Sequence, residues 1–561
     1  MIMRRAITVL LAALALCTCA SPPGSLGFDA RARDAARDAP SAADAPADAT
    51  AQPLDARVDP PDSATPPADF DPALWEGSVI YFVLTDRFAN GDPSNDGDDG
   101  CTDPASPTLY HGGDFRGLSD HLDYIEELGA DAVWITPVPE QIGCGYHGYW
   151  ADLDDPYDGR IEPRLGGEAG LTALIDALHA REMRLVVDHV VNHSGRRARL
   201  TTTHPEWLHP DRPACESLGD PEVMCPLSGL PDLAHERDDV AAYMDALSID
   251  FVRRFDFDGI RIDTVKHVAP EYFREHWVPA VHGARPSLYL LGEIFDEGGY
   301  GLHDRYLETG IHGHFDFPLR RAIIASLAQG GSIDGVARRV QEAVTRFGIE
   351  RARLRSLFLD NHDVPRFLVE MGSRPDDERR ARYHLALAVI LTTPGIPQIL
   401  YGDELGMSGN YPENRRDMPA WAWAEETRGG TPVGYLPDPA RTHEWTRRLI
   451  ALRSEIPALS HGDYAELWRP GGSGVELWAF VRAHDDSHVV VAFNAGATTL
   501  TDRSTRLRDN PGVAPTTAAA FPDGAVLVDR LGEGRGTSAR IEGGRLLVTL
   551  PPRSVAIFTP R

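Results

Sequence analysis

Acidic side chains follow three of the short apolar runs in this sequence. Asp263 ends GIRID, Glu293 ends LYLLGE, and Asp363 comes just after SLFLDN. Such runs are typical of buried strands, in which successive side chains face opposite sides. An inward carboxylate is costly unless it has a partner or a role. The three carboxylates therefore indicate a site for acid and base chemistry.

Other polar residues stand at comparable positions. Arg261 lies two residues before Asp263 and so on the same face of its strand. A single such group would more often be a cap or a satisfied core group. Five strands of this kind together favour function, and the remaining residues are Asp188, Asn192, His193, His147, Tyr149, Trp150 and His362.

Two carboxyl groups about 5 to 5.5 Å apart can cleave a sugar acetal with retention of configuration. One attacks the anomeric carbon while the other protonates the leaving oxygen. Arg261 would keep Asp263 ionised, so Asp263 is the better nucleophile. Glu293 ends an apolar run, which favours a raised pKa and the role of general acid.

These residues require a scaffold of parallel strands. Eight strand-like runs alternate with segments such as LTALIDALHAREM, whose apolar residues recur every three or four positions, as on a helix face. Alternation of this kind predicts an α/β fold, a closed (β/α)8 TIM barrel with its site at the carboxyl ends of the strands. The runs cover residues 79–84, 132–136, 184–188, 259–263, 288–293, 314–317, 356–361 and 396–401.

Two regions depart from this rhythm. About 45 residues separate RLVVD from the helix expected near Asp238, which predicts a small excursion domain at about 194–235 after the third strand. After THEWTRRLIALRSEIP the pattern changes to short strands with Gly-rich turns. We therefore expect a barrel over 73–458 and a C-terminal all-β sandwich domain over 459–561.

The first 20 residues have two arginines, an apolar run and small residues, which predicts an export signal. Cleavage after Ala20 and lipidation at Cys17 or Cys19, as in bacterial lipoproteins, both fit. Residues 21–72 are nearly all Ala, Asp, Pro and Arg and are expected to form a disordered linker. The protein is therefore expected to be secreted or to be a lipoprotein of the cell envelope.

Four cysteines remain beyond the predicted signal. An even count in an exported chain favours two disulfides over free thiols, and proximity favours Cys215 with Cys225, which leaves Cys101 with Cys144.

The formal net charge is −29. Such a charge repels phosphates, which argues against nucleic acid and fits a neutral ligand. We expect a monomer that contacts a membrane only through an N-terminal lipid anchor.

An ordered series of segments resembles the α-amylase superfamily of retaining glycoside hydrolases over about residues 75–455. The segments are YHGYW (146–150), DHVVNH (188–193), LPDL (230–233), GIRIDTVKH (259–267), LGEIF (291–295), LDNHD (359–363) and GIPQILYGDE (395–404).

The resemblance implies Asp263 as nucleophile, Glu293 as acid and base, and Asp363 as the carboxylate that grips the distorted sugar. Lys266 and His267 would hold the leaving part of the glucan, and this pair favours α-1,4 links. The other substrate-binding residues by resemblance are His147, Tyr149, Trp150, His193, Arg261, Phe295, His362 and Arg415.

The resemblance also implies one or two Ca²⁺ sites. Asn192, Asp232 and the main-chain carbonyl of His267 would bind an ion that pins the excursion domain, while Glu222 lies one residue away from the family's spacing for a further ligand. A second site resembles the N-terminal loop of cyclodextrin glucanotransferases, with ligands Asn90, Asp92, Asn95, Asp96, Gly112 and Asp114; an acidic turn without metal is the alternative.

The sequence departs from those relatives in several places. His111 replaces a cysteine, Tyr411 stands where an acidic residue is often found, and residues 194–232 contain no counterpart of the central aromatic of glucanotransferases. The expected function is endo-hydrolysis of α-1,4-glucan links in starch, glycogen and maltooligosaccharides. The alternatives are a cyclomaltodextrinase, a maltooligosaccharide-preferring or transglycosylating relative, and a surface glucan-binding protein without catalysis.

Overall fold

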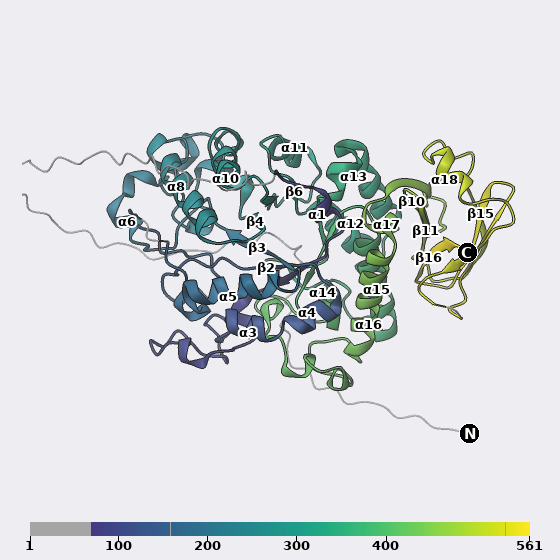
Figure 1. Cartoon of the computed structure of the whole chain (residues 1–561), viewed down its shortest axis with the longest axis horizontal. Helices are drawn as coiled ribbons and strands as arrows, with labels where there is room; N and C mark the ends of the chain where they lie inside the picture. The colour runs from purple at the N-terminus through teal and green to yellow at the C-terminus, as the bar shows by residue number, and fades with distance from the viewer. Residues whose placement is uncertain (1–68, 157–158, 533) are drawn as a thin grey trace, which may run out of the picture. The chain divides into compact units, whose positions relative to one another are not determined.

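The computed structural model describes residues 69–156, 159–532 and 534–561 (Figure 1). The predicted export signal, the lipidation sites and nearly all of the predicted linker lie outside these ranges. Within them, no helix combines the length and apolar character that crossing a membrane requires.

All eight predicted barrel strands are present and parallel, so the TIM-barrel prediction is confirmed. Their order is β6-β5-β4-β3-β2-β1-β8-β7, and a parallel bridge between Phe315 and Ser356 joins the two ends into a closed barrel. The strands are β1 (Ile80–Val83), β2 (Ala132–Ile135), β3 (Arg184–His189), β4 (Gly259–Ile262), β5 (Tyr289–Gly292), β6 (Gly313–His314), β7 (Ser356–Phe358) and β8 (Ile396–Leu400).

Successive side chains of β4 face opposite sides of the strand, so Arg261 faces away from Ile260 and Ile262. Ile260, Arg261 and Ile262 are all fully buried. The guanidinium of Arg261 lies among the aromatic rings of Trp134, Tyr149 and Phe315. Register places Arg261 beside Asp188 of β3, which brings charged groups of neighbouring strands to one level of the barrel.

Helices link the barrel strands (Figure 1). Those of six or more residues are α3 (Phe115–Asp120), α4 (Leu122–Leu128), α5 (Gly167–His179), α8 (Asp238–Arg254), α10 (Val278–Ala284), α11 (Gly301–Leu307), α12 (Phe317–Ile323), α13 (Asp334–Arg353), α15 (Asp376–Thr392) and α16 (Pro439–Glu455). The predicted start near Asp238 is confirmed by α8.

The excursion after β3 consists of short helical turns. They are α6 (Leu200–Thr203), η3 (Pro205–Trp207), η4 (Ala214–Ser217), α7 (Pro221–Met224) and η5 (Leu227–Gly229). The disulfide Cys215–Cys225 joins η4 to the end of α7, and Cys101–Cys144 joins two loops of the barrel. Both predicted pairings are confirmed.

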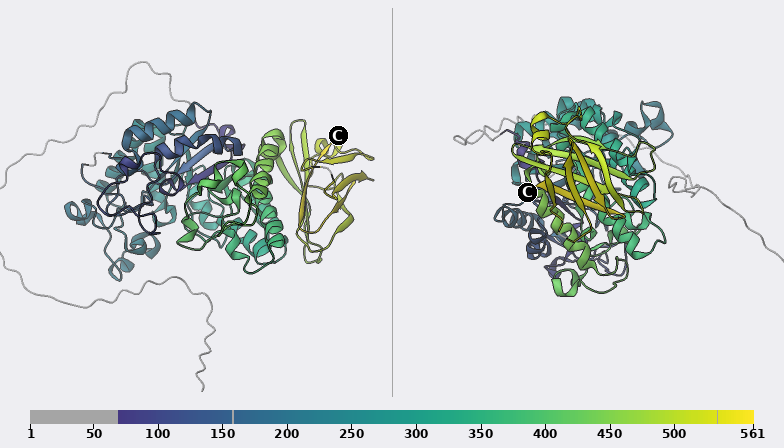
Figure 2. Two further views of the ribbon diagram at one scale, coloured as in Figure 1. Left: turned by 90° about the horizontal axis from the view of Figure 1, so that it is seen from below. Right: turned by 90° about the vertical axis from the view of Figure 1, so that its right-hand side faces the viewer.

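The C-terminal part is built on a β-sheet (Figure 2) and also contains the short helix α18 (Pro515–Ala519). The strands pair antiparallel in the order β12-β15-β14-β13-β16-β11-β10-β9. The Thr505 hydroxyl of β12 donates to the carbonyl of Leu467 in β9, so the two ends of the sheet meet over a second apolar core. The strands are β9 (Asp463–Trp468), β10 (Leu477–His484), β11 (Ser487–Asn494), β12 (Leu500–Arg506), β13 (Val526–Asp529), β14 (Ser538–Glu542), β15 (Arg545–Leu550) and β16 (Ser554–Pro560).

Candidate active site

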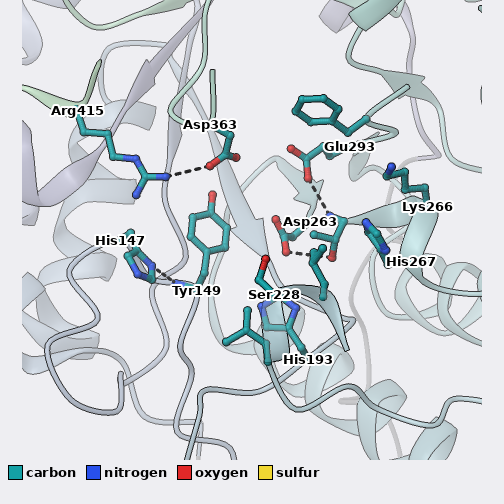
Figure 3. A pocket seen from close by; sticks show the side chains of 14 residues that line it. His147, Tyr149, His193, Ser228, Asp263, Lys266, His267, Glu293, Asp363 and Arg415 are labelled. Atoms are coloured by element: carbon teal, nitrogen blue, oxygen red, sulfur yellow. Dashed lines mark hydrogen bonds and ion pairs between the residues drawn. The ribbon is translucent and has the colours of Figure 1, made fainter. Parts of the chain in front are cut away.

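A cavity of about 410 Å³ lies where the barrel strands end (Figure 3). The three predicted catalytic carboxylates, Asp263, Glu293 and Asp363, all line it. They come from the ends of β4, β5 and β7, so the closed barrel gathers residues that are 100 positions apart in the sequence. This is the level at which TIM barrels carry their active sites.

Arg261 lies at the centre of the charged groups. Its Nη1 is 2.5 Å from Asp263 Oδ1 and 3.0 Å from Asp188 Oδ1, and its Nη2 is 2.7 Å from Glu293 Oε1. The sequence predicted that Arg261 serves Asp263, and the structure adds Glu293 as a second partner. Because one guanidinium contacts both carboxyl groups, Asp263 and Glu293 must be neighbours, as a retaining pair requires.

Thr264 connects the same two carboxyl groups from the other side. Its backbone N–H donates to Glu293 Oε2 at 3.0 Å, and its hydroxyl donates to Asp263 Oδ2 at 3.1 Å. Thr264 has a φ of +48°, a left-handed conformation that a β-branched residue rarely adopts. This strained turn aims both donors at the pair. Sequence analysis did not identify Thr264 as a site residue, because nothing in the sequence signals its backbone angle.

Asp188 was noted at a strand end but not assigned to the site. It accepts hydrogen bonds from Arg261 and from the Tyr149 hydroxyl, the latter at 2.7 Å. Burial raises the pKa of Asp188 to about 7, against the lowering effect of Arg261. Its position at the end of RLVVD was the available signal.

The pKa values of Glu293 and Asp363, which both line the cavity, are shifted in opposite directions. Burial raises the pKa of Glu293 to about 8; Arg261 opposes this rise, while Asp263 and Asp363 add to it. Burial also disfavours the charged form of Asp363, but His362, Arg415 and Arg261 together lower the pKa of Asp363. Glu293 is thus suited to hold a proton and Asp363 to remain an anion at neutral pH.

Asp363 is held by two predicted sugar-binding residues. Arg415 Nη2 is 3.0 Å from Asp363 Oδ1, and His362 Nε2 is 3.1 Å from Asp363 Oδ2. The Arg415 Nε also donates to the His362 carbonyl at 2.8 Å. The Asp363 side chain keeps 38% of its surface exposed toward the cavity, so it can still accept from a ligand.

The loop after β2 supplies one wall of the cavity. Gly148 has a φ of +89°, and a Cβ there would lie 2.4 Å from the Pro137 carbonyl oxygen, so the turn requires glycine. The turn places His147 and Tyr149 in the lining. Trp150 was predicted to bind substrate as well, but its ring packs edge-on against His147 and does not line the cavity.

Two buried histidines have ring nitrogens without a protein partner. His193 lines the cavity, and its Nε2 makes no hydrogen bond within the described part of the chain. The same holds for Nδ1 of His362, which lies behind the wall and stacks on Tyr149 at 5.2 Å. The Nε2 of His193 is therefore available to a polar group of a molecule bound in the cavity.

The opposite wall combines a cation, a histidine and apolar groups. Lys266, His267 and Phe295 line it, together with Leu227, Ser228 and Leu230 of the excursion. Among the described residues of the excursion that line the cavity, none is aromatic.

The comparison with known families decides the assignment. A model described as "Alpha amylase, catalytic domain" matches residues 82–207 and 224–448, more than half of the chain. The chain belongs to the α-amylase family of glycoside hydrolases. It is therefore an enzyme, and the alternative of a glucan-binding protein without catalysis is set aside.

Named relatives of this α-amylase-family chain differ in specificity. A "Beta/alpha-amylase" from Paenibacillus polymyxa is 29% identical over 86% of this chain, which spans only 38% of that protein. A cyclomaltodextrinase from a Bacillus species is 28% identical over 76% of this chain and 74% of its own length. The solved α-amylase from Geobacillus thermoleovorans in complex with acarbose is 28% identical, with a TM-score of 0.71 over 87% of this chain and 99% of that one.

The predicted first calcium site contains an amide oxygen without a protein partner and a buried carboxylate. Asn192 Oδ1 is buried without a hydrogen-bond partner in the described structure, and a backbone bridge joins His193 to Asp232. Asp232 is buried and accepts from His209 Nδ1 at 2.6 Å. An orphaned amide oxygen beside a buried carboxylate suits a hard cation. Glu222, considered as a further ligand, instead has its carboxylate on Lys266.

In the predicted second site, the polar side chains largely contact one another and the surrounding backbone. Asn90 donates to both carboxylate oxygens of Asp96, and Asn95 Oδ1 is buried without a partner in the described structure. A Cβ on Gly112 would lie 2.6 Å from Asp96 Oδ1, so only glycine leaves this cradle open. Asp114 accepts from the backbone of Gly91 and Asp92 and caps α3, while Asp92 caps the turn that follows it.

No group of three or more His, Cys, Asp or Glu side chains capable of holding a metal occurs in the described residues. His111, which replaces a cysteine, pairs with Asp417 at 2.6 Å, and Cys101 bonds to Cys144.

Proposed function

We propose that this enzyme hydrolyses α-1,4-glucosidic links within starch, glycogen and maltooligosaccharides by double displacement with retention of configuration. The observation that carries the proposal is the single Arg261 guanidinium between Asp263 and Glu293, together with the raised pKa of Glu293.

In the first step, Asp263 attacks the anomeric carbon and Glu293 gives its proton to the leaving glycosidic oxygen. This leaves a glycosyl ester on Asp263 and a glucan with a free hydroxyl. In the second step, Glu293 takes a proton from water, the water oxygen attacks the anomeric carbon, and the ester bond to Asp263 breaks. Arg261 stabilises the carboxylate that forms again.

The other cavity residues have roles in binding. Asp363 would accept from hydroxyls of the reacting sugar, with Arg415 and His362 keeping it anionic. Tyr149 would stack on that sugar, and Nε2 of His193 is available to one of its hydroxyls. Lys266 and His267 would contact the glucan on the leaving-group side, where Phe295 offers a ring for stacking.

Calcium belongs to the proposal as a structural ion. Asn192, Asp232 and the His267 carbonyl would hold it, and it would neutralise charge where the excursion meets the barrel. Export, possession of a lipid anchor and the monomeric state remain part of the proposal, and the first two rest on residues outside the described ranges.

The second candidate is a cyclomaltodextrinase or a transglycosylating relative. It is favoured by relatives named cyclomaltodextrinase, neopullulanase and maltogenic α-amylase. Leu227 and Leu230 give the cavity an apolar rim, and Phe295 could retain an acceptor sugar.

Digestion of amylose, pullulan and cyclodextrin by the purified enzyme separates the two candidates. Rapid internal cleavage of amylose, with slow attack on cyclodextrin, supports the first. Faster cleavage of cyclodextrin than of amylose, or products longer than the substrate, would replace it with the second. Comparison of amylose with an α-1,6-linked glucan also tests the linkage.

A further inference from the structure

Glu222 of the excursion holds both residues on the leaving-group side of the cavity. Its carboxylate Oε1 is 2.6 Å from Lys266 Nζ. Its backbone carbonyl is 2.8 Å from Nδ1 of the His267 ring. One residue from a separate part of the chain therefore fixes two neighbouring side chains of the site.

The local fold explains why Glu222 reaches this position. Asp220 caps α7, and its Oδ1 accepts from the Glu222 N–H at 3.0 Å. The disulfide Cys215–Cys225 closes the loop in which α7 lies. Helix α7 packs against the turn Val265–His267, which carries the two site residues. Glu222 is thus presented from a constrained turn.

The contact to His267 also sets the state of its ring. A carbonyl oxygen only accepts hydrogen bonds, so Nδ1 of the His267 ring must carry the hydrogen in this contact. With Nδ1–H donating to the Glu222 carbonyl, Nε2 carries a lone pair and can accept from a sugar hydroxyl. The ring then offers the glucan an acceptor.

The contact to Lys266 restricts a flexible cation. An ammonium has three donors, and Glu222 uses one of them, which leaves two for hydroxyls of the substrate. A fully exposed ion pair would contribute little to stability, but Lys266 is 21% exposed and lines the cavity. Its orientation matters for binding more than for folding.

We propose that Glu222 is a positioning residue that orients Lys266 and His267 toward the glucan on the leaving-group side. This inference rests on the proposed function, because it assumes that a sugar chain occupies that side. Glu222 thereby makes cleavage depend on sugars beyond the bond that breaks.

The test compares two substrates that share the glycon side. Maltoheptaose places sugars against Lys266 and His267, whereas α-maltosyl fluoride has a leaving group without a sugar. For Glu222→Gln we expect kcat/KM on maltoheptaose to fall by about tenfold, as loss of a charge-assisted contact predicts. On α-maltosyl fluoride we expect a change of less than about twofold.

Two further variants make the comparison specific. Glu216→Gln is the matched control, because Glu216 lies in the same excursion, is 46% exposed against 45% for Glu222, and pairs with Arg212 at 2.7 Å outside the cavity. Glu216→Gln should leave kcat/KM on both substrates unchanged. Lys266→Met should weaken cleavage of maltoheptaose, and adding Glu222→Gln to it should cause no further loss, since the pair acts as a unit.

Several outcomes would overturn the inference. The first is that Glu222→Gln leaves kcat/KM on maltoheptaose unchanged. The second is that it lowers kcat/KM on both substrates equally. The third is that it lowers kcat/KM in the Lys266→Met background as much as it does in the wild type. Failure of the proposed function looks different, because the wild-type enzyme itself would then cleave no α-1,4-glucan.

Discussion

At the residue scale, the buried guanidinium of Arg261 lies between carboxyl groups that must hold different protonation states. Arg261 contacts Asp263, Glu293 and Asp188, and Thr264 donates to the first two. Burial nevertheless keeps the pKa of Glu293 high, so a proton is available for the leaving oxygen. The sequence indicated these roles from Arg261 and the apolar run before Glu293. It could not indicate that Arg261 serves both groups.

The raised pKa of Glu293 predicts the alkaline side of the pH profile. Glu293 must be protonated in the free enzyme to act as acid, so activity is present below its pKa of about 8 and is lost as pH rises through it. Measured kcat/KM on maltoheptaose should fall by about tenfold per pH unit above this limit. A decline that begins near pH 5 would show that the general acid does not have the raised pKa that burial gives Glu293.

At the element scale, the sequence predicted the strands that carry the site better than it predicted the turns. Most of the barrel strands could be predicted because buried parallel strands are apolar runs, but β6 (Gly313–His314) is not such a run, and the run predicted at 314–317 overlaps it only at His314. In the C-terminal part, β12 (LTDRSTR) and β14 (SARIE) carry few apolar residues, so the sequence indicates them less clearly than β11 (SHVVVAFN). Thr264 and Trp150 show the limit at the site, since turn conformation sets where each side chain points.

The turn at Gly148 gives a test at this scale. Gly148→Ala places a Cβ 2.4 Å from the Pro137 carbonyl in a left-handed backbone, whereas Gly143 of the same loop, with φ +64°, has open space around it. We expect Gly143→Ala to cost about 1 kcal/mol of unfolding free energy and Gly148→Ala about 3 kcal/mol. Only Gly148→Ala should also lower kcat/KM, because His147 and Tyr149 move.

Chemical denaturation and kinetics of the two variants measure this difference. Equal destabilisation of both variants, with unchanged kinetics, would show that close approach at Gly148 does not position the site.

At the scale of the whole molecule, the barrel and the excursion contribute different residues to the site. The barrel supplies the carboxylates, and the excursion supplies Leu227, Leu230 and Glu222. The sequence predicted these parts from the long segment after the third strand and from the change of pattern near residue 458. It did not predict that Glu222 would contact Lys266, because a contact over 44 positions depends on how α7 is folded.

Calcium removal tests how the excursion is held. An ion that binds only the folded enzyme stabilises it by about 2.7 kcal/mol at 100 times its dissociation constant. EDTA should therefore lower the melting temperature, and EDTA preloaded with Ca²⁺ should not. Asn192→Ala should reduce this response, since Asn192 Oδ1 is the orphaned oxygen of the set. A melting temperature unaffected by EDTA would remove calcium from the account.

The central claim is double displacement through Asp263. Proton NMR during cleavage of maltoheptaose can record which anomer of the new reducing end forms first, before mutarotation. The account predicts the α-anomer first, and predicts that Asp263→Asn, which changes little in volume, keeps the fold but releases no product. Initial formation of the β-anomer, or turnover by Asp263→Asn comparable with the wild type, would contradict it.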